Sequence, residues 1–183
     1  MPEAAPATWN RHRSALRSFG AWAGLEHLAD GLDRRADPRP PVEAIGAAQL
    51  EALWSRTDLP LRERVLWRLL HESGAGVKAV LSLNVEDLDL DDRRARAGDG
   101  WVSWRSRTAL LLPQLVGGRS RGPLFLADRR PGPARMPATG DLCPETGRRR
   151  LSYERAEYLF KQATKPVDPR GSGFTLRRLR PRP

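Results

Sequence analysis

The apolar residues between 61 and 105 change their period, and this change limits the chain to a mixed fold. From 61 to 72 they keep helical spacing, with a buried stripe of Leu61, Val65, Leu66, Leu69 and Leu70. From Asn84 to Leu90 they alternate with carboxylates, which predicts a turn that leads into a half-buried strand. Gly98-Asp99-Gly100 then separates two short segments, 94–97 and 101–105, and is a strong hairpin signal. The pattern predicts an α+β fold, mainly helical, with a small three-stranded antiparallel sheet.

Helical spacing also occurs on both sides of this region. We predict helices over residues 47–57, 77–83, 107–116 and 152–164, the third despite Pro113 and the last with Ser152 as its N-cap. Leu124-Phe125-Leu126 predicts one more short strand, and the Gly-, Pro- and Arg-rich residues 127–149 predict a long loop. On the last helix, Tyr153 and Tyr158 are interpreted as packing residues rather than nucleophiles.

The N-terminal part of the chain reads as a separate region. Residues 8–24 have the spacing of an amphipathic helix with an apolar face and a basic face. Residues 37–42, Asp-Pro-Arg-Pro-Pro-Val, have the composition of a stiff, extended linker. We therefore predict three parts: a helical region over 1–36, a Pro-rich linker over 37–42 and a main domain over 43–183.

The charge of the chain favours a polyanionic partner. The sequence has 32 Lys and Arg against 22 Asp and Glu, a net charge of +10 with a pI near 11.1. Residues 148–183 hold eleven basic and three acidic residues, or +8 of this excess. A solvated basic tail without a partner is the alternative. No long apolar run, signal peptide or lipidation motif indicates a membrane, and the single cysteine, Cys143, suits a reducing compartment, so we expect a cytoplasmic protein.

Common motifs for small-molecule and metal chemistry are missing from the sequence. There is no phosphate-binding Gly-x-x-x-x-Gly-Lys loop, no dinucleotide-binding Gly-x-Gly-x-x-Gly, no His-Glu-x-x-His and no Gly-x-Ser-x-Gly. The three histidines are scattered, and the carboxylates between Glu86 and Asp91 are explained by strand alternation. We therefore expect neither a metal site nor a small-molecule cofactor.

Two tryptophans in the predicted hairpin are candidates for contact with DNA. Trp101 and Trp104 are three residues apart, so on a strand they point to opposite faces and at least one is expected to be exposed, beside Arg105 and Arg107. Trp9, Trp54 and Trp67 instead lie on or beside apolar helical stripes, where core packing explains them.

Three segments of the chain resemble motifs of the tyrosine recombinases, or phage integrases. Residues 69–90, from Leu69-Leu70-His71-Glu72-Ser73-Gly74-Ala75-Gly76 to Glu86-Asp87-Leu88-Asp89, resemble the family's "helix, Thr-Gly-x-Arg, short helix, Leu-x-x-Glu-Asp-Leu-Asp" segment. The likeness continues through Leu151-Ser152-Tyr153-Glu154-Arg155-Ala156. Thr175-Leu176-Arg177-Arg178-Leu179-Arg180 resembles the Thr-Leu-His-x-Leu-Arg-His box. The resemblance as a whole spans roughly residues 43–180. The predicted helix over 8–24 resembles the last helix of the family's core-binding (SAM-like) domain.

The resemblance implies DNA strand exchange without a metal or cofactor. Members of this family attack a phosphodiester with a tyrosine and form a 3′-phosphotyrosyl intermediate. Two arginines hold the non-bridging oxygens of the scissile phosphate, a hairpin lysine assists the leaving oxygen, and histidines transfer protons. Residues 1–36 would then be a remnant of the core-binding domain, and 43–183 the N-terminal and middle part of the catalytic domain.

Carried over by position, the resemblance retains little of this apparatus. The family's first arginine falls on Gly76, and the hairpin lysine falls on Asp99 or Gly100. The box histidine falls on Arg177, and the second arginine is retained as Arg180. The chain then ends before the family's nucleophilic tyrosine, so we expect a truncated catalytic domain that lacks its C-terminal end and does not cleave DNA.

These observations give one leading hypothesis and two alternatives. The leading hypothesis is an integrase-family protein of DNA integration and site-specific recombination that binds double-stranded DNA but does not cut it. The DNA-binding candidates are Arg105, Arg107, Arg177, Arg178 and Arg180 in the main domain and Arg11, Arg13 and Arg17 in the first helix. The alternatives are a non-catalytic DNA-binding or regulatory module that acts with an intact recombinase subunit, and a non-functional pseudogene product.

Overall fold

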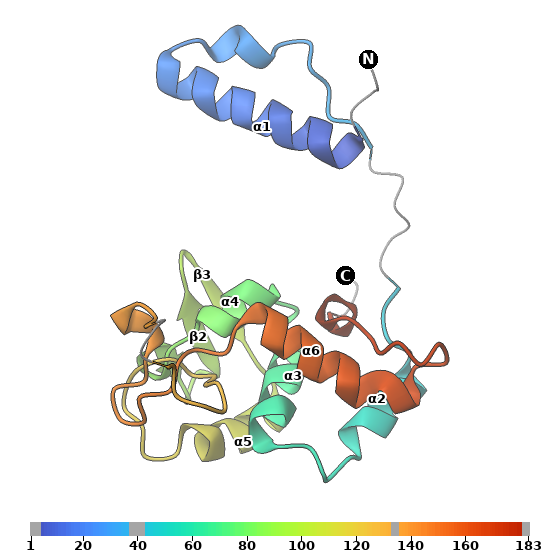
Figure 1. The fold of residues 1–183 in the computed structure, drawn as a ribbon, viewed down its shortest axis with the longest axis vertical. Coiled ribbons are helices and arrows are strands. Elements are labelled where there is room, and N and C mark those ends of the chain that lie inside the picture. The colour runs from blue at the N-terminus through green and yellow to red at the C-terminus, as the bar shows by residue number, and fades with distance from the viewer. Residues whose placement is uncertain (1–4, 37–42, 133–135, 181–183) are drawn as a thin grey trace. The chain divides into compact units, whose positions relative to one another are not determined.

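The chain divides into two compact units, Met1–Pro41 and Val42–Pro183 (Figure 1). The computed structural model describes residues 5–36, 43–132 and 136–180. The boundary between the units falls inside the Pro-rich segment 37–42, which lies outside the described residues. The assignment of the units to a core-binding remnant and a partial catalytic domain stays a prediction.

The first unit is one helix with a chain segment folded back along it. Helix α1 (Pro6–Ala23) ends at Gly24, which has a φ of 71°, and the 3₁₀ turn η1 (Glu26–Ala29) follows. The side chain of Asn10 exchanges two hydrogen bonds with the backbone of Arg35, at 2.8 and 3.0 Å. Within this unit Phe19 and Trp22 remain exposed, so the apolar face of the predicted helix is not buried by the unit itself.

The second unit is built around helix α3 (Leu61–Ser73). Its Val65, Leu66, Leu69 and Leu70 are at most 1% exposed, and burial stabilises each such side chain by about 1.5–3 kcal/mol. Trp67 packs edge-on against Phe160, with ring centroids 5.2 Å apart. The predicted helices are confirmed: α2 (Ala47–Trp54), α4 (Val77–Ser82), α5 (Ser106–Val116, with Pro113 inside it) and α6 (Tyr153–Thr164).

The predicted three-stranded antiparallel sheet is also confirmed. It has the order β1 (Leu88–Asp89), β2 (Arg94–Ala97) and β3 (Gly100–Ser103), with Arg96 opposite Trp101. The predicted turn that leads into the first strand is the 3₁₀ turn η2 (Val85–Asp87). The carboxylate of Asp87 accepts a hydrogen bond from the backbone nitrogen of Asn84 at 2.8 Å and so closes this turn.

The connection between α5 and α6 differs in one respect from the prediction. Leu124-Phe125-Leu126 is no strand, since only isolated bridges form there, between Asn84 and Pro123 and between Leu126 and Arg150. The long loop that follows contains the 3₁₀ turn η4 (Thr139–Asp141), and α6 is followed by η5 (Lys165–Val167) and η6 (Leu176–Leu179). None of the helices in the described ranges has the length and apolar character needed to cross a membrane.

Candidate nucleic-acid interface

The arginine-rich segment at 177–180 is held by apolar side chains between its arginines. Phe174, Leu176 and Leu179 are at most 2% exposed, and the backbone nitrogen of Leu176 donates to the carboxylate of Glu157 on α6 at 3.0 Å. Arg177 and Arg180 are exposed. The turn η6 therefore presents these two guanidinium groups on a backbone that is fixed to the core.

Arg180 lies beside the loop that joins α3 to α4. Its Nε donates to the carbonyl oxygen of Gly74 at 2.8 Å, across 106 residues of sequence. One turn earlier on α3, the imidazole Nδ1 of His71 contacts the carbonyl oxygen of Leu179 at 3.0 Å. Gly74 itself has a φ of 61°, which ends α3 in the left-handed conformation that glycine favours. The fold therefore joins the 71–76 segment to the end of η6.

Gly76 follows in the same loop and is the N-cap residue of α4. It is exposed, and a Cβ built on it would meet no other atom within 4 Å. A side chain at this position would therefore have open space, two residues from the carbonyl that holds Arg180.

Glu72 fixes the start of α5 next to this loop. Its carboxylate accepts hydrogen bonds from the backbone nitrogens of Arg105 at 2.7 Å and Thr108 at 3.3 Å. These contacts satisfy donors at a helix N-terminus, where four amide groups have no partner within the helix. Arg105 and Arg107 are exposed in the same turn. The role of Glu72 was not anticipated, because nothing in the sequence couples it to residues 33 positions away.

The hairpin between β2 and β3 exposes one tryptophan and one carboxylate. Trp101 is 54% exposed, whereas Trp104 is buried, which confirms that at least one of the two lies on the surface. The cations near Trp101 are not Arg105 and Arg107: Arg94 and Arg96 lie over its ring, 4.6 and 5.9 Å from the centroid. Asp99 is exposed in the hairpin turn.

Comparison with solved structures identifies the fold. No protein-family model and no curated protein matches the sequence. The structure of the XerA recombinase matches 98% of this chain, with a TM-score of 0.58 and 16% sequence identity. The integrase from mycobacterium phage Brujita also matches 98% of this chain, with a TM-score of 0.50 and 18% sequence identity. The Tn1549 transposon integrase, solved in complex with circular intermediate DNA, is similar to 96% with a TM-score of 0.57 and 14% identity. The chain has the tyrosine-recombinase fold.

The expected α+β architecture is thereby confirmed as one that these recombinase and integrase structures share. The chain spans 67%, 57% and 64% of the lengths of these three recombinase and integrase chains. In the tyrosine-recombinase resemblance Gly76 and Arg180 stand at the two arginine positions. The contact of Arg180 with Gly74 brings these positions to one loop.

Not every arginine of the candidate interface is free to bind a ligand. The Nε of Arg178 donates to the carbonyl oxygen of Glu43 at 2.7 Å, and its guanidinium lies over the ring of Phe174, 4.5 Å from the centroid. In the first unit Arg13 donates to the carbonyl oxygen of Leu32, while Arg11 and Arg17 are exposed. Arg178 and Arg13 therefore have structural partners that the sequence did not reveal.

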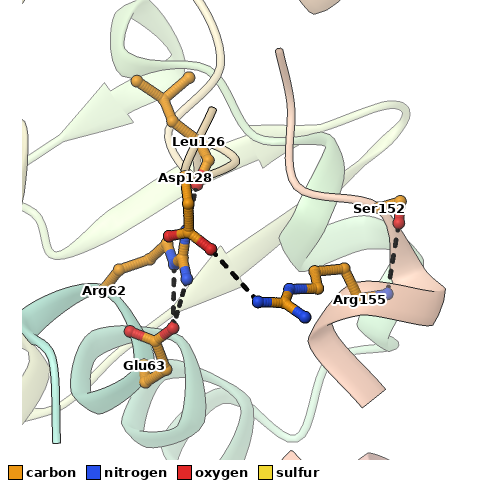
Figure 2. Close-up of polar contacts among 6 residues, drawn as sticks. All are labelled: Arg62, Glu63, Leu126, Asp128, Ser152 and Arg155. Carbon is orange, nitrogen blue, oxygen red and sulfur yellow. Dashed lines mark hydrogen bonds and ion pairs between the residues drawn. The ribbon is translucent and has the colours of Figure 1, made fainter. Parts of the chain in front are cut away.

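Further basic residues of the second unit hold loops in place (Figure 2). Arg62 at the start of α3 donates to the carbonyl oxygen of Leu126 at 2.6 Å and to the carboxylate of Asp128 at 2.8 Å, and it also pairs with Glu63. Arg155 of α6 donates to the carboxylate of Asp128 at 3.5 Å. Burial acts to raise the pKa of Asp128, but the hydrogen bonds and charges of Arg62 and Arg155 together outweigh it and hold this pKa below its ordinary value. This network joins α3, the 126–128 segment and α6.

Arg150 is a second structural arginine within the C-terminal charge excess. It donates to the carbonyl oxygens of Leu81 and Leu83, both at 3.0 Å, to the side chain of Asn84 at 2.7 Å and to the carboxylate of Asp141 at 2.8 Å. The guanidinium fork satisfies several acceptors at once, which a lysine cannot do. The local excess of charge therefore overstates the number of arginines available to DNA.

The two tyrosines of α6 are exposed rather than packed, which corrects their interpretation as packing residues. Tyr153 is 36% and Tyr158 52% exposed, and the guanidinium of Arg155 lies 5.3 Å from the ring centroid of Tyr158. Partial burial and the carboxylate of Glu157 raise the pKa of Tyr153, while Arg177 acts in the opposite direction.

Within the described ranges no cluster of three or more His, Cys, Asp or Glu side chains is placed to hold a metal ion.

Proposed function

We propose that this chain is a DNA-binding member of the tyrosine recombinase family, acting in DNA integration and site-specific recombination, and that as this chain it does not cleave DNA. The observation that carries the proposal is the exposure of four arginines on a fixed backbone: Arg180 is held by the carbonyl of Gly74, and the backbone of Arg105 is held by Glu72. Arg177 is exposed near Arg180 in sequence, and Arg107 is exposed near Arg105. Fixed arginines of this kind suit the phosphates of duplex DNA. A DNA complex of one integrase with the same fold supports this partner.

The residues at the catalytic positions support the lack of cleavage. Gly76 offers no side chain to a phosphate. In the hairpin, the family's lysine would fall on Asp99, whose carboxylate would repel a phosphate, or on Gly100, which has no side chain. Loss of a single donor to the developing charge lowers the rate of such reactions by about 10²–10³. The absence of an arginine at position 76 and of a lysine in the hairpin turn therefore supports binding without strand cleavage.

Two measurements test the proposal. In gel-shift titrations of the full chain with duplex DNA, the logarithm of the binding constant should fall linearly with the logarithm of salt concentration. In a second assay the chain is incubated with a nicked suicide duplex and separated under denaturing conditions. No covalent adduct should appear; a covalent adduct would refute the proposed inactivity, and absence of binding at low salt would refute the proposed partner.

The same titrations separate a working DNA-binding module from a decayed remnant. The intact arginine surface beside the replaced Gly76 and Asp99 positions favours a non-catalytic module that occupies a recombination site, alone or with an intact recombinase subunit. Such a module should bind one sequence in the nanomolar range, typically about 10³-fold or more tighter than random DNA. Weak binding of all sequences, abolished by modest salt, would instead indicate a remnant.

A further inference from the structure

A small cavity between α2, α3 and α5 is lined by four arginines, of which Arg56 is paired with Asp58. It has a volume of about 100 Å³, and its lining includes Leu53, Leu59 and Leu111 together with Arg64, Arg68 and Arg107. In the part of the chain that the structure describes, none of these three arginines forms an ion pair. An apolar floor with a cationic rim fits an apolar side chain flanked by carboxylates.

The arginines of this rim repel one another. Partial burial lowers the pKa of Arg68, and the charges of Arg107 and Arg64 lower it further, against attraction from Glu72 and Glu51. The guanidinium of Arg68 lies over the ring of Trp54, 4.4 Å from its centroid. At one side of the cavity Leu110 is 65% exposed. A ligand that brings negative charge to this rim would relieve the repulsion.

The chain itself carries a group with the complementary chemistry. Leu90 is 43% exposed at the turn between β1 and β2, and it is followed by Asp91 and Asp92. Asp92 pairs with Arg94 at 2.7 Å, whereas Asp91 is exposed and has no ion pair within the described ranges. A volume near 100 Å³ compares with the 30 Å³ or so that one water occupies in the liquid, so it has room for one leucine side chain.

We propose that the cavity is a docking site for a second copy of this chain, in which Leu90 of one copy enters the cavity of the other and Asp91 meets Arg68 and Arg107. The contact joins two different surfaces, so it forms dimers if reciprocal and longer assemblies if head to tail. Because Arg107 is also a candidate DNA contact, DNA bound at Arg107 would compete with this docking. Because only one apolar side chain is buried in it, the contact is weak. Copies held close together on one larger molecule would form it more readily, because their effective concentration is higher.

Disulfide trapping of the full chain tests this contact, since the only native cysteine, Cys143, is buried. Leu90→Cys and Leu110→Cys are prepared as separate variants, mixed and oxidised in a glutathione buffer. We expect their mixed disulfide to form faster than that between Leu90→Cys and Tyr158→Cys, an exposed control position on α6. Equal rates for the two mixtures would overturn the proposal.

Charge reversal then tests the pairing. Arg68→Glu in the Leu110→Cys chain should slow trapping about tenfold or more, because like charges in a contact are strongly unfavourable. Asp91→Arg in the Leu90→Cys chain should do the same, and the two reversals together should restore the rate. Arg121→Glu, an exposed control, should have no effect. Trapping that is lost with each reversal but not restored by both would overturn the assignment, and thermal unfolding of every variant identifies those that fail to fold.

Discussion

Arg180 and Gly74 are 106 residues apart in sequence, and a hydrogen bond of 2.8 Å joins the guanidinium of one to the carbonyl of the other. The acceptor is a backbone group at the end of α3, so it is present whatever side chain occupies that loop. One N–H of the guanidinium is used in this contact, and the side chain as a whole remains exposed. Arg180 is therefore oriented by the protein while it keeps donors for a ligand.

Replacement of Arg180 should weaken DNA binding without unfolding the protein. Arg180→Ala removes one positive charge from the surface, so we expect a weaker binding constant for every DNA sequence and a salt slope reduced by about one. Gel-shift titrations over a salt series measure both quantities. Arg121→Ala removes the same charge from an exposed position away from this loop and should leave affinity nearly unchanged. Equal effects of the two variants would contradict a defined interface.

An arginine at position 76 should be accommodated and should strengthen binding. Because a Cβ at Gly76 meets no atom within 4 Å, we expect Gly76→Arg to change the free energy of unfolding by no more than about 0.5–1 kcal/mol. The added cation lies in the loop that holds Arg180, so the salt slope should become steeper by about one. Gly76→Gln, of similar length but uncharged, separates charge from bulk.

Gly173 should tolerate no side chain. It has a φ of 78°, and a Cβ there would lie 2.1 Å from the carbonyl oxygen of Lys161. We expect Gly173→Ala to lower the free energy of unfolding by more than the roughly 1–3 kcal/mol that an unfavourable φ costs by itself. Gly171→Ala is the matched control, since Gly171 has a φ of 65° and open space around its Cβ position. Chemical denaturation of both should show Gly173→Ala as clearly the less stable.

The loop 168–173 should lose stability in acid. The backbone nitrogen of Arg170, and then the hydroxyl and nitrogen of Ser172, hold the pKa of Asp168 below its ordinary value of about 3.9. A carboxylate with a lowered folded-state pKa stabilises the fold above the unfolded-state pKa, and this contribution disappears as pH falls through the folded-state value. The difference in melting temperature between the native chain and Asp168→Asn should therefore be largest above pH 5 or so and shrink below about pH 4. A difference that is constant with pH would contradict this role.

Local patterns in the sequence were enough to predict the helices and strands. Which arginines are free to bind DNA depends instead on contacts between residues far apart in the sequence. The apolar stripe of α3 and the Gly98-Asp99-Gly100 signal depend on neighbouring residues, so the helix and the hairpin could be predicted. The turn before the first strand was predicted from the change of period, but alternation does not reveal that Asp87 closes this turn by accepting from the backbone of Asn84. Arg178 was predicted to bind DNA. Its hydrogen bond to the carbonyl oxygen of Glu43 spans 135 residues and could not be predicted from any local pattern in the sequence.

The carboxylate of Glu72 has two opposite effects on DNA binding. It holds the backbone at the start of α5, where Arg105 and Arg107 lie, and its negative charge lowers the total positive potential that DNA experiences there. Its removal would thus attract DNA more strongly at long range while it releases the start of α5. The rate of association with DNA would increase, and the arginines at the start of α5 would be less well oriented in the bound complex.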